Sequence, residues 1–294
     1  MTSRASGTIL FVANFPANTG YAWDFVERLY GGVATRLAPR GVRTLVAYPE
    51  IASPPQTLVG TPAEPVLLDA RLDSVRSLRQ TVSFIRHERV DLLYLADRPT
   101  RSSRYLLLRA AGVRSILVHQ HTSGAATAPR GMKRLAKWML ARLPGLTADR
   151  VVAVSDFVAR RQVEVGMMPA RRVARVWNGV PVFPGGDEVS RTARRQLGLE
   201  RGGPLVVCTC RATPEKGVDH LLRAFDRLSV GPGEGRGSPL LAYAGNGPAF
   251  RRLQMLRDSL PSRDRIHLLW RRWRGESPWL PRKSAAFPRS SSME

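Results

Sequence analysis

The sequence of 294 residues predicts an α/β protein with two doubly wound, Rossmann-like domains, of which the second is incomplete. Three observations support this fold class. Short apolar runs of strand length alternate with segments of helical periodicity, which is typical of parallel sheets covered by helices. A polar segment interrupts this alternation over residues 183–203. The alternation then resumes, and it collapses after Leu269.

The first domain, predicted over residues 1–182, begins with a βαβ unit. Its first strand, residues 8–13, is apolar throughout, as in strands that are buried on both faces. A helical pattern over residues 22–38 ends at Pro39-Arg40-Gly41, and a second strand follows over residues 42–47. The alternation continues with strands at 66–68, 91–96, 115–119, 150–155 and 173–177, and helices at 75–88, 103–111, 130–143 and 156–165.

Residues 183–203 indicate an inter-domain linker with a short helix near residues 189–197. A partial second domain is predicted over residues 204–269, with strands at 205–210, 240–244 and 265–269 and helices at 218–228 and 249–259. Three strands are few for a complete nucleotide-binding domain, so we expect an open edge at the late strands and exposed apolar surface.

Residues 270–294 form an irregular basic tail with neither a helical nor a strand period. Three of the six Trp residues fall in this segment. So abrupt a shift in composition suggests a non-native reading frame or a truncated gene. The alternative is a basic, aromatic tail that binds a membrane or a nucleic acid.

The composition is strongly basic, with 46 Lys and Arg against 23 Asp and Glu. Such an excess favours a polyanionic partner, but only four of the 46 are Lys, which also fits GC-rich codon usage. No apolar run has the length of a spanning helix and the N-terminus does not resemble a signal peptide, so we expect a cytoplasmic protein. Cys208 and Cys210 indicate reduced thiols, with no zinc-ligand pattern and no cofactor.

Two loops that follow strands have the composition of a phosphate site. Arg211-Ala-Thr-Pro-Glu-Lys-Gly217 places two cations between a strand and a helix N-terminus, which suits a diphosphate. Ala244-Gly-Asn-Gly-Pro248 follows the next strand, and its glycines allow close approach to the backbone. The candidates for binding a diphosphate are Arg211 and Lys216.

These loops resemble the Arg-x4-Lys-Gly and Gly-x-Gly-Pro elements of family-4-like glycosyltransferases with the GT-B fold (glycosyl transferases group 1). Val151-Val-Ala-Val-Ser-Asp156 and Trp177-Asn-Gly-Val180 resemble further segments of that family, and the resemblance covers residues 8–269. It implies retaining, metal-independent transfer from a nucleotide-diphosphate sugar to a glycan, lipid-linked or small-molecule acceptor, as in polysaccharide biosynthesis. Arg211 and Lys216 would then hold the leaving diphosphate, and Gly245, Asn246 and Gly247 would lie against the nucleotide. The sequence contains no Asp-x-Asp metal element, in keeping with this assignment.

The resemblance also implies site residues in the first domain. Gly20 matches the glycine of a loop that faces the inter-domain cleft, although the family's usual Gly-Gly pair is missing. His119 or His121, at the end of a strand, would contact the donor sugar as the catalytic candidate, and the choice between them is open. The carboxyl ends of strands are where open α/β sheets bind ligands.

One family element is missing. The family's second domain carries Glu-x7-Glu for the donor sugar and ribose, whereas none of the eleven Glu residues here has another eight positions away. We therefore expect weak or no activity from this chain and a marginally stable second domain. The alternatives are a non-catalytic remnant that binds a nucleotide or polyanion, and nucleic-acid binding through the Arg-rich surface, for which no recognition motif is present.

The predicted helix at 130–143 is amphipathic. Its apolar residues follow one helical stripe, and Lys133, Arg134 and Lys137 lie on other faces. We expect an ordinary domain helix whose polar face is solvated. The alternative is peripheral docking on an anionic membrane, at the inner face of the cytoplasmic membrane.

Overall fold

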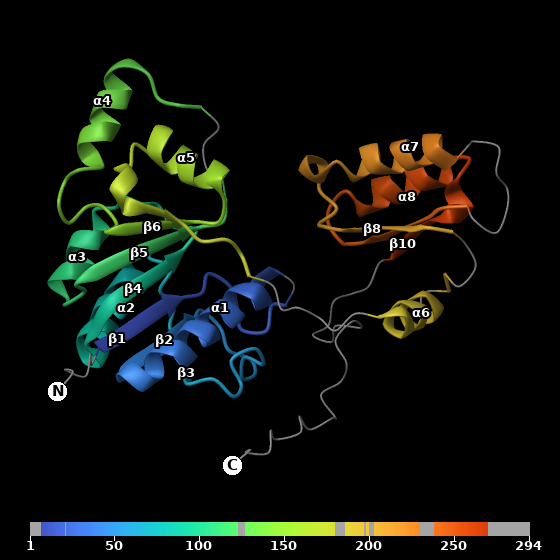
Figure 1. Cartoon of the computed structure of the whole chain (residues 1–294). Coiled ribbons are helices and arrows are strands. Elements are labelled where there is room, and N and C mark those ends of the chain that lie inside the picture. The colour runs from blue at the N-terminus through green and yellow to red at the C-terminus, as the bar shows by residue number, and fades with distance from the viewer. Residues whose placement is uncertain are drawn as a thin grey trace, which may run out of the picture. The chain divides into compact units, whose positions relative to one another are not determined.

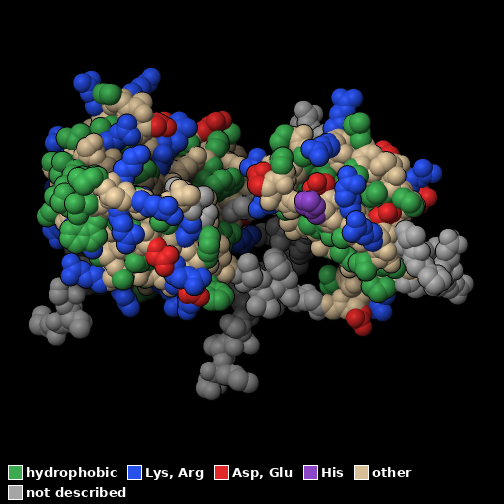
Figure 2. Space-filling model, turned by 90° about the horizontal axis from the view of Figure 1, so that it is seen from above, with side chains coloured by type: hydrophobic (Ala, Val, Ile, Leu, Met, Phe, Trp, Pro, Cys, Tyr) green, Lys and Arg blue, Asp and Glu red, His purple; other side chains and the backbone are tan. Residues whose placement is uncertain are grey.

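The computed structural model describes residues 7–20, 22–122, 127–179, 186–196, 198–199, 203–229 and 238–269. The predicted tail, residues 270–294, and Val180 lie outside these ranges. The chain divides into two compact units, residues 1–181 and 182–294 (Figure 1). Lys and Arg side chains are spread over the surface of both units in Figure 2.

The first unit is built on a seven-stranded parallel sheet in the order β3-β2-β1-β4-β5-β6-β7. Chain order reverses between β1 and β4, as in doubly wound Rossmann-like sheets, which confirms the predicted fold class. The strands are β1 (Gly7–Val12), β2 (Val42–Tyr48), β3 (Ala63–Leu67), β4 (Val90–Ala96), β5 (Ser115–Gln120), β6 (Arg150–Ala153) and β7 (Val173–Arg175).

Helices cover both faces of this sheet (Figure 1). On one face, Phe11 packs with Val26 and Tyr30 of the first helix. Leu10 points to the opposite face, where it packs with residues of the next two helices, including Ile85 and Leu108. Neighbouring residues of one strand therefore enter two separate cores, as the continuous apolar run predicts. The helices are α1 (Ala22–Leu37), α2 (Val75–Glu88), α3 (Arg104–Ala110), α4 (Gly131–Leu140) and α5 (Asp156–Glu164).

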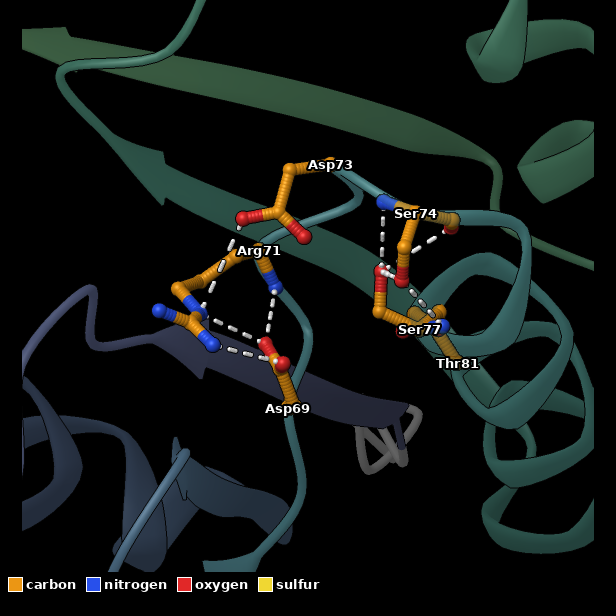
Figure 3. A network of polar contacts seen from close by, with 6 residues as sticks. All are labelled: Asp69, Arg71, Asp73, Ser74, Ser77 and Thr81. Atoms are coloured by element: carbon orange, nitrogen blue, oxygen red, sulfur yellow. Dashed lines mark hydrogen bonds and ion pairs between the residues drawn. The ribbon is translucent and has the colours of Figure 1, made fainter.

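Local hydrogen bonds fix where α2 begins. The backbone N–H of Ser77 donates to Ser74 Oγ at 3.1 Å, and the backbone N–H of Ser74 donates to Ser77 Oγ at 3.2 Å. This reciprocal cap satisfies two of the free donors at the helix start. Just before it, Arg71 pairs with Asp69 at 2.8 Å on the connection from β3 (Figure 3).

α4 departs from the sequence expectation. None of its residues is buried, so its apolar stripe does not pack into the core of the first unit. The expectation of an ordinary domain helix is therefore wrong for this element.

The second unit contains a three-stranded parallel sheet in the order β10-β9-β8. Leu222 and Phe225 from one helix, and Phe250 and Leu253 from another, form its core together with Tyr243 of the sheet. The predicted linker segment belongs to this unit and contains the first of its helices. Its elements are α6 (Asp187–Gln196), β8 (Leu205–Thr209), α7 (Val218–Ser229), β9 (Leu240–Ala244), α8 (Phe250–Asp258) and β10 (Ile266–Leu269).

The exposed apolar edge of the second sheet is its first strand. The open edge that we expected at the late strands is present at β10, which pairs with β9 alone among the described residues, but the exposed apolar side chains are on the other edge strand, where Val206 and Val207 of β8 are 40% and 60% exposed. Within the described part of the chain, β8 pairs with β9 alone. The first strand of the first unit, by contrast, has neighbours on both sides.

Candidate functional site

In the first unit, the polar candidates lie at the carboxyl ends of three adjacent strands. Asn14 follows β1, Asp97 follows β4, and His119 and His121 lie on and just after β5. Asn14 Nδ2 donates to the carbonyl of Ala96 at 2.5 Å, which ties the ends of β1 and β4 together. The doubly wound topology thus brings together residues that are more than eighty positions apart in sequence.

His119 is buried and uncharged at neutral pH. Its side chain is 2% exposed, and its Nδ1 lies 2.5 Å from the hydroxyl of Tyr94. Burial, with a smaller contribution from His121, lowers the pKa of His119 to about 4. Its Nε2 is buried and has no hydrogen-bond partner among the described residues. A polar atom left unpaired in this way is free to bind a ligand group.

His121 is placed beside His119 by Asp97. The two imidazole centroids are 4.2 Å apart, and the edge of Phe25 from α1 meets the His121 ring at 5.8 Å. Asp97 Oδ1 accepts the backbone N–H of His121 at 2.7 Å, and Asp97 Oδ2 lies 3.3 Å from His121 Nδ1. The Nε2 of His121 is also buried without a partner in the described part of the chain.

Asp97 is a residue that the sequence reasoning missed. Burial alone would raise the pKa of Asp97, but hydrogen bonds from His121 and from the backbone of Thr122 hold it below its ordinary value. The carboxylate is therefore charged and fixes the orientation of His121. The available signal was its position, since Asp97 is the first polar residue after a buried strand.

Gly20 lies at the turn from the first loop into α1. Its φ of 76° is in the left-handed region that favours glycine, and its carbonyl accepts the backbone N–H of Trp23 at 3.3 Å. The helix that starts here carries Phe25 to the ring of His121. Gly20 therefore shapes the start of an element that borders the histidine pair.

In the second unit, the two predicted phosphate-site loops lie side by side. The backbone N–H of Ala212 donates to the carbonyl of Asn246, and the backbone N–H of Ala249 donates to the carbonyl of Ala212, both at 2.9 Å. A Cβ on Gly245 would lie 2.0 Å from the carbonyl oxygen of Cys210, and one on Gly247 would lie 2.5 Å from that of Ala212. Both glycines are needed because the neighbouring loop occupies that space.

Arg211 and Lys216 are exposed on the first of these loops. Neither is held by an ion pair within the described residues. A short 3-10 turn, Pro214–Lys216, ends at Gly217, whose φ is 62°, and α7 begins at the next residue. The loop thus presents two unpaired cations beside a helix N-terminus, which is an arrangement suited to an anion.

The described residues contain no group of three His, Cys, Asp or Glu side chains that could hold a metal ion. Cys208 and Cys210 are free thiols on and after β8, with their sulfur atoms 3.9 Å apart. Burial raises the pKa of the Cys208 thiol. In the same part of the chain, no helix has both the length and the apolar character needed to cross a bilayer.

Comparison with known proteins identifies a family. The model of Glycosyltransferase Family 4 matches residues 26–182, which is more than half of the chain. This range includes Asp97, His119 and His121 but not the loops of the second unit. No curated protein matches the sequence.

Solved structures of glycosyltransferases share the fold. One from Rickettsia africae is 17% identical with a TM-score of 0.64, covering 90% of this chain and 68% of its own. HepE of Anabaena, in complex with UDP-glucose, is 17% identical with a TM-score of 0.60, and the match covers 89% of this chain and 68% of HepE. The lipopolysaccharide outer core galactosyltransferase WaaB is 13% identical with a TM-score of 0.51, and the match covers 88% of this chain and 66% of WaaB. At these identities the likeness shows the fold.

Proposed function

Because the chain belongs to Glycosyltransferase Family 4, we propose that it binds a nucleotide-diphosphate sugar as the donor for glycosyl transfer. The family match over residues 26–182 is the observation that carries the proposal. HepE, which shares the fold, binds UDP-glucose, and this supports the donor class. The acceptor would be a glycan, a lipid-linked molecule or a small molecule. A nucleotide-sugar donor also supports a cytoplasmic location.

The second unit would supply the diphosphate site. Arg211 and Lys216 would bind the diphosphate, and the segment Gly245–Gly247 would lie along the nucleotide. As the bond between the sugar and the diphosphate oxygen breaks, negative charge grows on the leaving group, and the two cations stabilise it. The acceptor hydroxyl oxygen forms the new bond to the sugar, and its proton passes to the departing diphosphate. We propose that the reaction is retaining and needs no metal ion.

The first unit would supply contacts to the donor sugar. In the arrangement we propose, the Tyr94 hydroxyl donates to Nδ1 of His119, so the neutral ring carries its proton on Nε2. His121 donates from Nδ1 to Asp97, which leaves its Nε2 as an acceptor. One donor and one acceptor would then be free for sugar hydroxyl groups. This pairing gives the two histidines different roles.

We further propose that transfer by this chain is weak or absent. The sequence has no pair of Glu residues eight positions apart to hold the sugar and ribose, whereas the phosphate-site loops are present. The same observation favours a second candidate function, a non-catalytic protein that binds a nucleotide or another polyanion. Both candidates require the diphosphate site, and only the first requires turnover.

Calorimetry of the full chain with UDP, GDP and ADP tests the site. We expect one of them to bind and the R211Q/K216Q variant to bind it roughly 100-fold more weakly, because two charge-assisted contacts are lost. The matched control is R36Q/R40Q at the C-terminal end of α1, which neutralises two exposed arginines of the first unit, outside both loops. Failure of all three nucleotides to bind, or equal loss in the control, contradicts the proposal. Robust turnover of a UDP-sugar would contradict the expected weak activity.

A further inference from the structure

The apolar stripe of α4 is uncovered in the first unit. Lys137 is the one half-buried residue of the helix, and all its others are exposed. The large apolar side chains keep between 43% and 79% of their surface, and these are Met132, Leu135, Trp138, Met139, Leu140 and, just past the helix, Leu143. A soluble domain rarely leaves so large a contiguous apolar surface without a partner.

The anchoring of α4 turns this stripe outward. Arg101 Nη1 donates to the carbonyl of Lys137 at 3.2 Å and to the carbonyl of Gly166 at 2.8 Å, which holds the helix against the unit beside Lys137. Met132 lies near the centre of the stripe. At about 100° per residue, Lys137 lies about 140° around the helix from Met132. The stripe therefore points away from the unit, and the exposed Lys133 and Arg142 flank it on either side, at about 100° and about 80° from Met132.

The stretch of chain that carries the stripe has basic residues and no acidic ones. No Asp or Glu occurs between Asp97 and Asp149, a stretch that contains ten Lys and Arg residues. The guanidinium of Arg142 stacks over the Trp138 ring at 3.9 Å, and Lys133 is exposed on the helix. Figure 2 shows hydrophobic side chains gathered at one edge of the first unit with Lys and Arg around them.

These charges decide between possible occupants. A second copy docked on the same face would bring two sets of cations together, which opposes association. An anionic lipid surface offers complementary charge to the basic residues and an apolar layer to the stripe. Trp138 adds a side chain that favours the boundary between lipid headgroups and acyl chains.

We propose that residues 130–143 dock on an anionic membrane, with the stripe of α4 in the headgroup region and Lys133 and Arg142 against lipid phosphates. This surface is carried by the first unit alone. It does not depend on the proposed transfer reaction, so a failure of either leaves the other standing.

Flotation of the full chain with vesicles tests the proposal. Vesicles of phosphatidylcholine alone are compared with vesicles that also contain phosphatidylglycerol. We expect flotation with the anionic vesicles and a roughly 30-fold weaker partition for K133Q/R142Q at low salt. The L135S/M139S variant should lose about tenfold or more, because it removes apolar surface from the stripe.

Matched variants on α8 separate this surface from general charge attraction. R251Q/R252Q removes two exposed cations and M255S removes an exposed apolar side chain, and both should float like the unchanged chain. Circular dichroism and Tm check that all variants fold. The proposal is overturned by absent flotation, by equal losses in the α8 variants, or by a dimer in sedimentation velocity that L135S/M139S converts to monomer.

Discussion

Replacing Gly245 with alanine tests whether the two loops of the second unit need their close contact. The new Cβ would lie 2.0 Å from the carbonyl oxygen of Cys210 and 2.4 Å from the hydroxyl of Tyr243. Tyr243 is fully buried and its hydroxyl donates to that same Cys210 carbonyl at 2.9 Å. Neither neighbour can yield by a simple side-chain rotation, so the backbone of one loop must move away from the other.

The cost follows from the contacts that this movement breaks. The two backbone hydrogen bonds between the loops and the bond from Tyr243 to Cys210 would be lost. At about 1 kcal/mol each, the free energy of unfolding of the second unit falls by about 3 kcal/mol. A unit this small has a total stability of only a few kcal/mol, so G245A should populate its unfolded form.

Urea denaturation of the full chain, with hydrogen exchange read at the amides of Ala212 and Ala249, measures this loss. The matched control is G32A in α1, where a Cβ meets nothing within 4 Å. Because alanine is a better helix former, G32A should stabilise the first unit by up to about 1 kcal/mol. The reasoning fails if G245A keeps the unfolding free energy and the amide protection of the unchanged chain.

Three further predictions concern single residues. Because the pKa of His119 is about 4 in the fold and about 6.5 unfolded, the unfolded state takes up the proton first, so stability should fall by roughly 3 kcal/mol between pH 6.5 and pH 4. Urea midpoints across this range should show that slope, and H119Q should flatten it. Asp97 has a φ of 50° and accepts two backbone N–H groups, so D97A should lower the free energy of unfolding by about 2 kcal/mol. D97N should lower it less, because Asn tolerates this backbone conformation and keeps an acceptor oxygen. Equal losses of unfolding free energy for the two variants in urea would contradict this. V207K on the exposed edge strand β8 should reduce aggregation measured by light scattering and change the free energy of unfolding by about 0.5 kcal/mol or less. Unchanged aggregation would contradict the inference that the chains associate through β8.

Most of the fold was predictable because periodicity reports burial. The run at residues 8–13 predicted a strand buried on both faces, and in the structure Leu10 and Phe11 enter opposite cores. Asp97 was not predictable in the same way, because its role depends on β4 and β5 lying side by side. A single acidic residue after a strand has no motif, and its contacts with the backbone and side chain of His121 give it a function.

The glycines of the second loop show how a correct pattern can have more than one cause. Their spacing predicted a backbone that a nucleotide can approach closely. In the structure, the positions of the missing Cβ atoms at Gly245 and Gly247 are taken by the carbonyl groups of Cys210 and Ala212. The glycines therefore allow this loop to pack against the loop that carries Arg211, and any nucleotide site there depends on that packing.

The two units also show why equal sequence patterns gave unequal burial. β1 and β8 both open a βαβ segment with an apolar run, and both were predicted as strands. β1 lies between β2 and β4, so Leu10 and Val12 are fully buried. Within the described residues β8 has a neighbour on one side alone, and Val207 is 60% exposed. A strand with the apolar composition of a central strand thus lies at an edge of the sheet, where its side chains are not fully buried. Because burial of apolar side chains stabilises a fold, we expect marginal stability in the unit that carries Arg211 and Lys216.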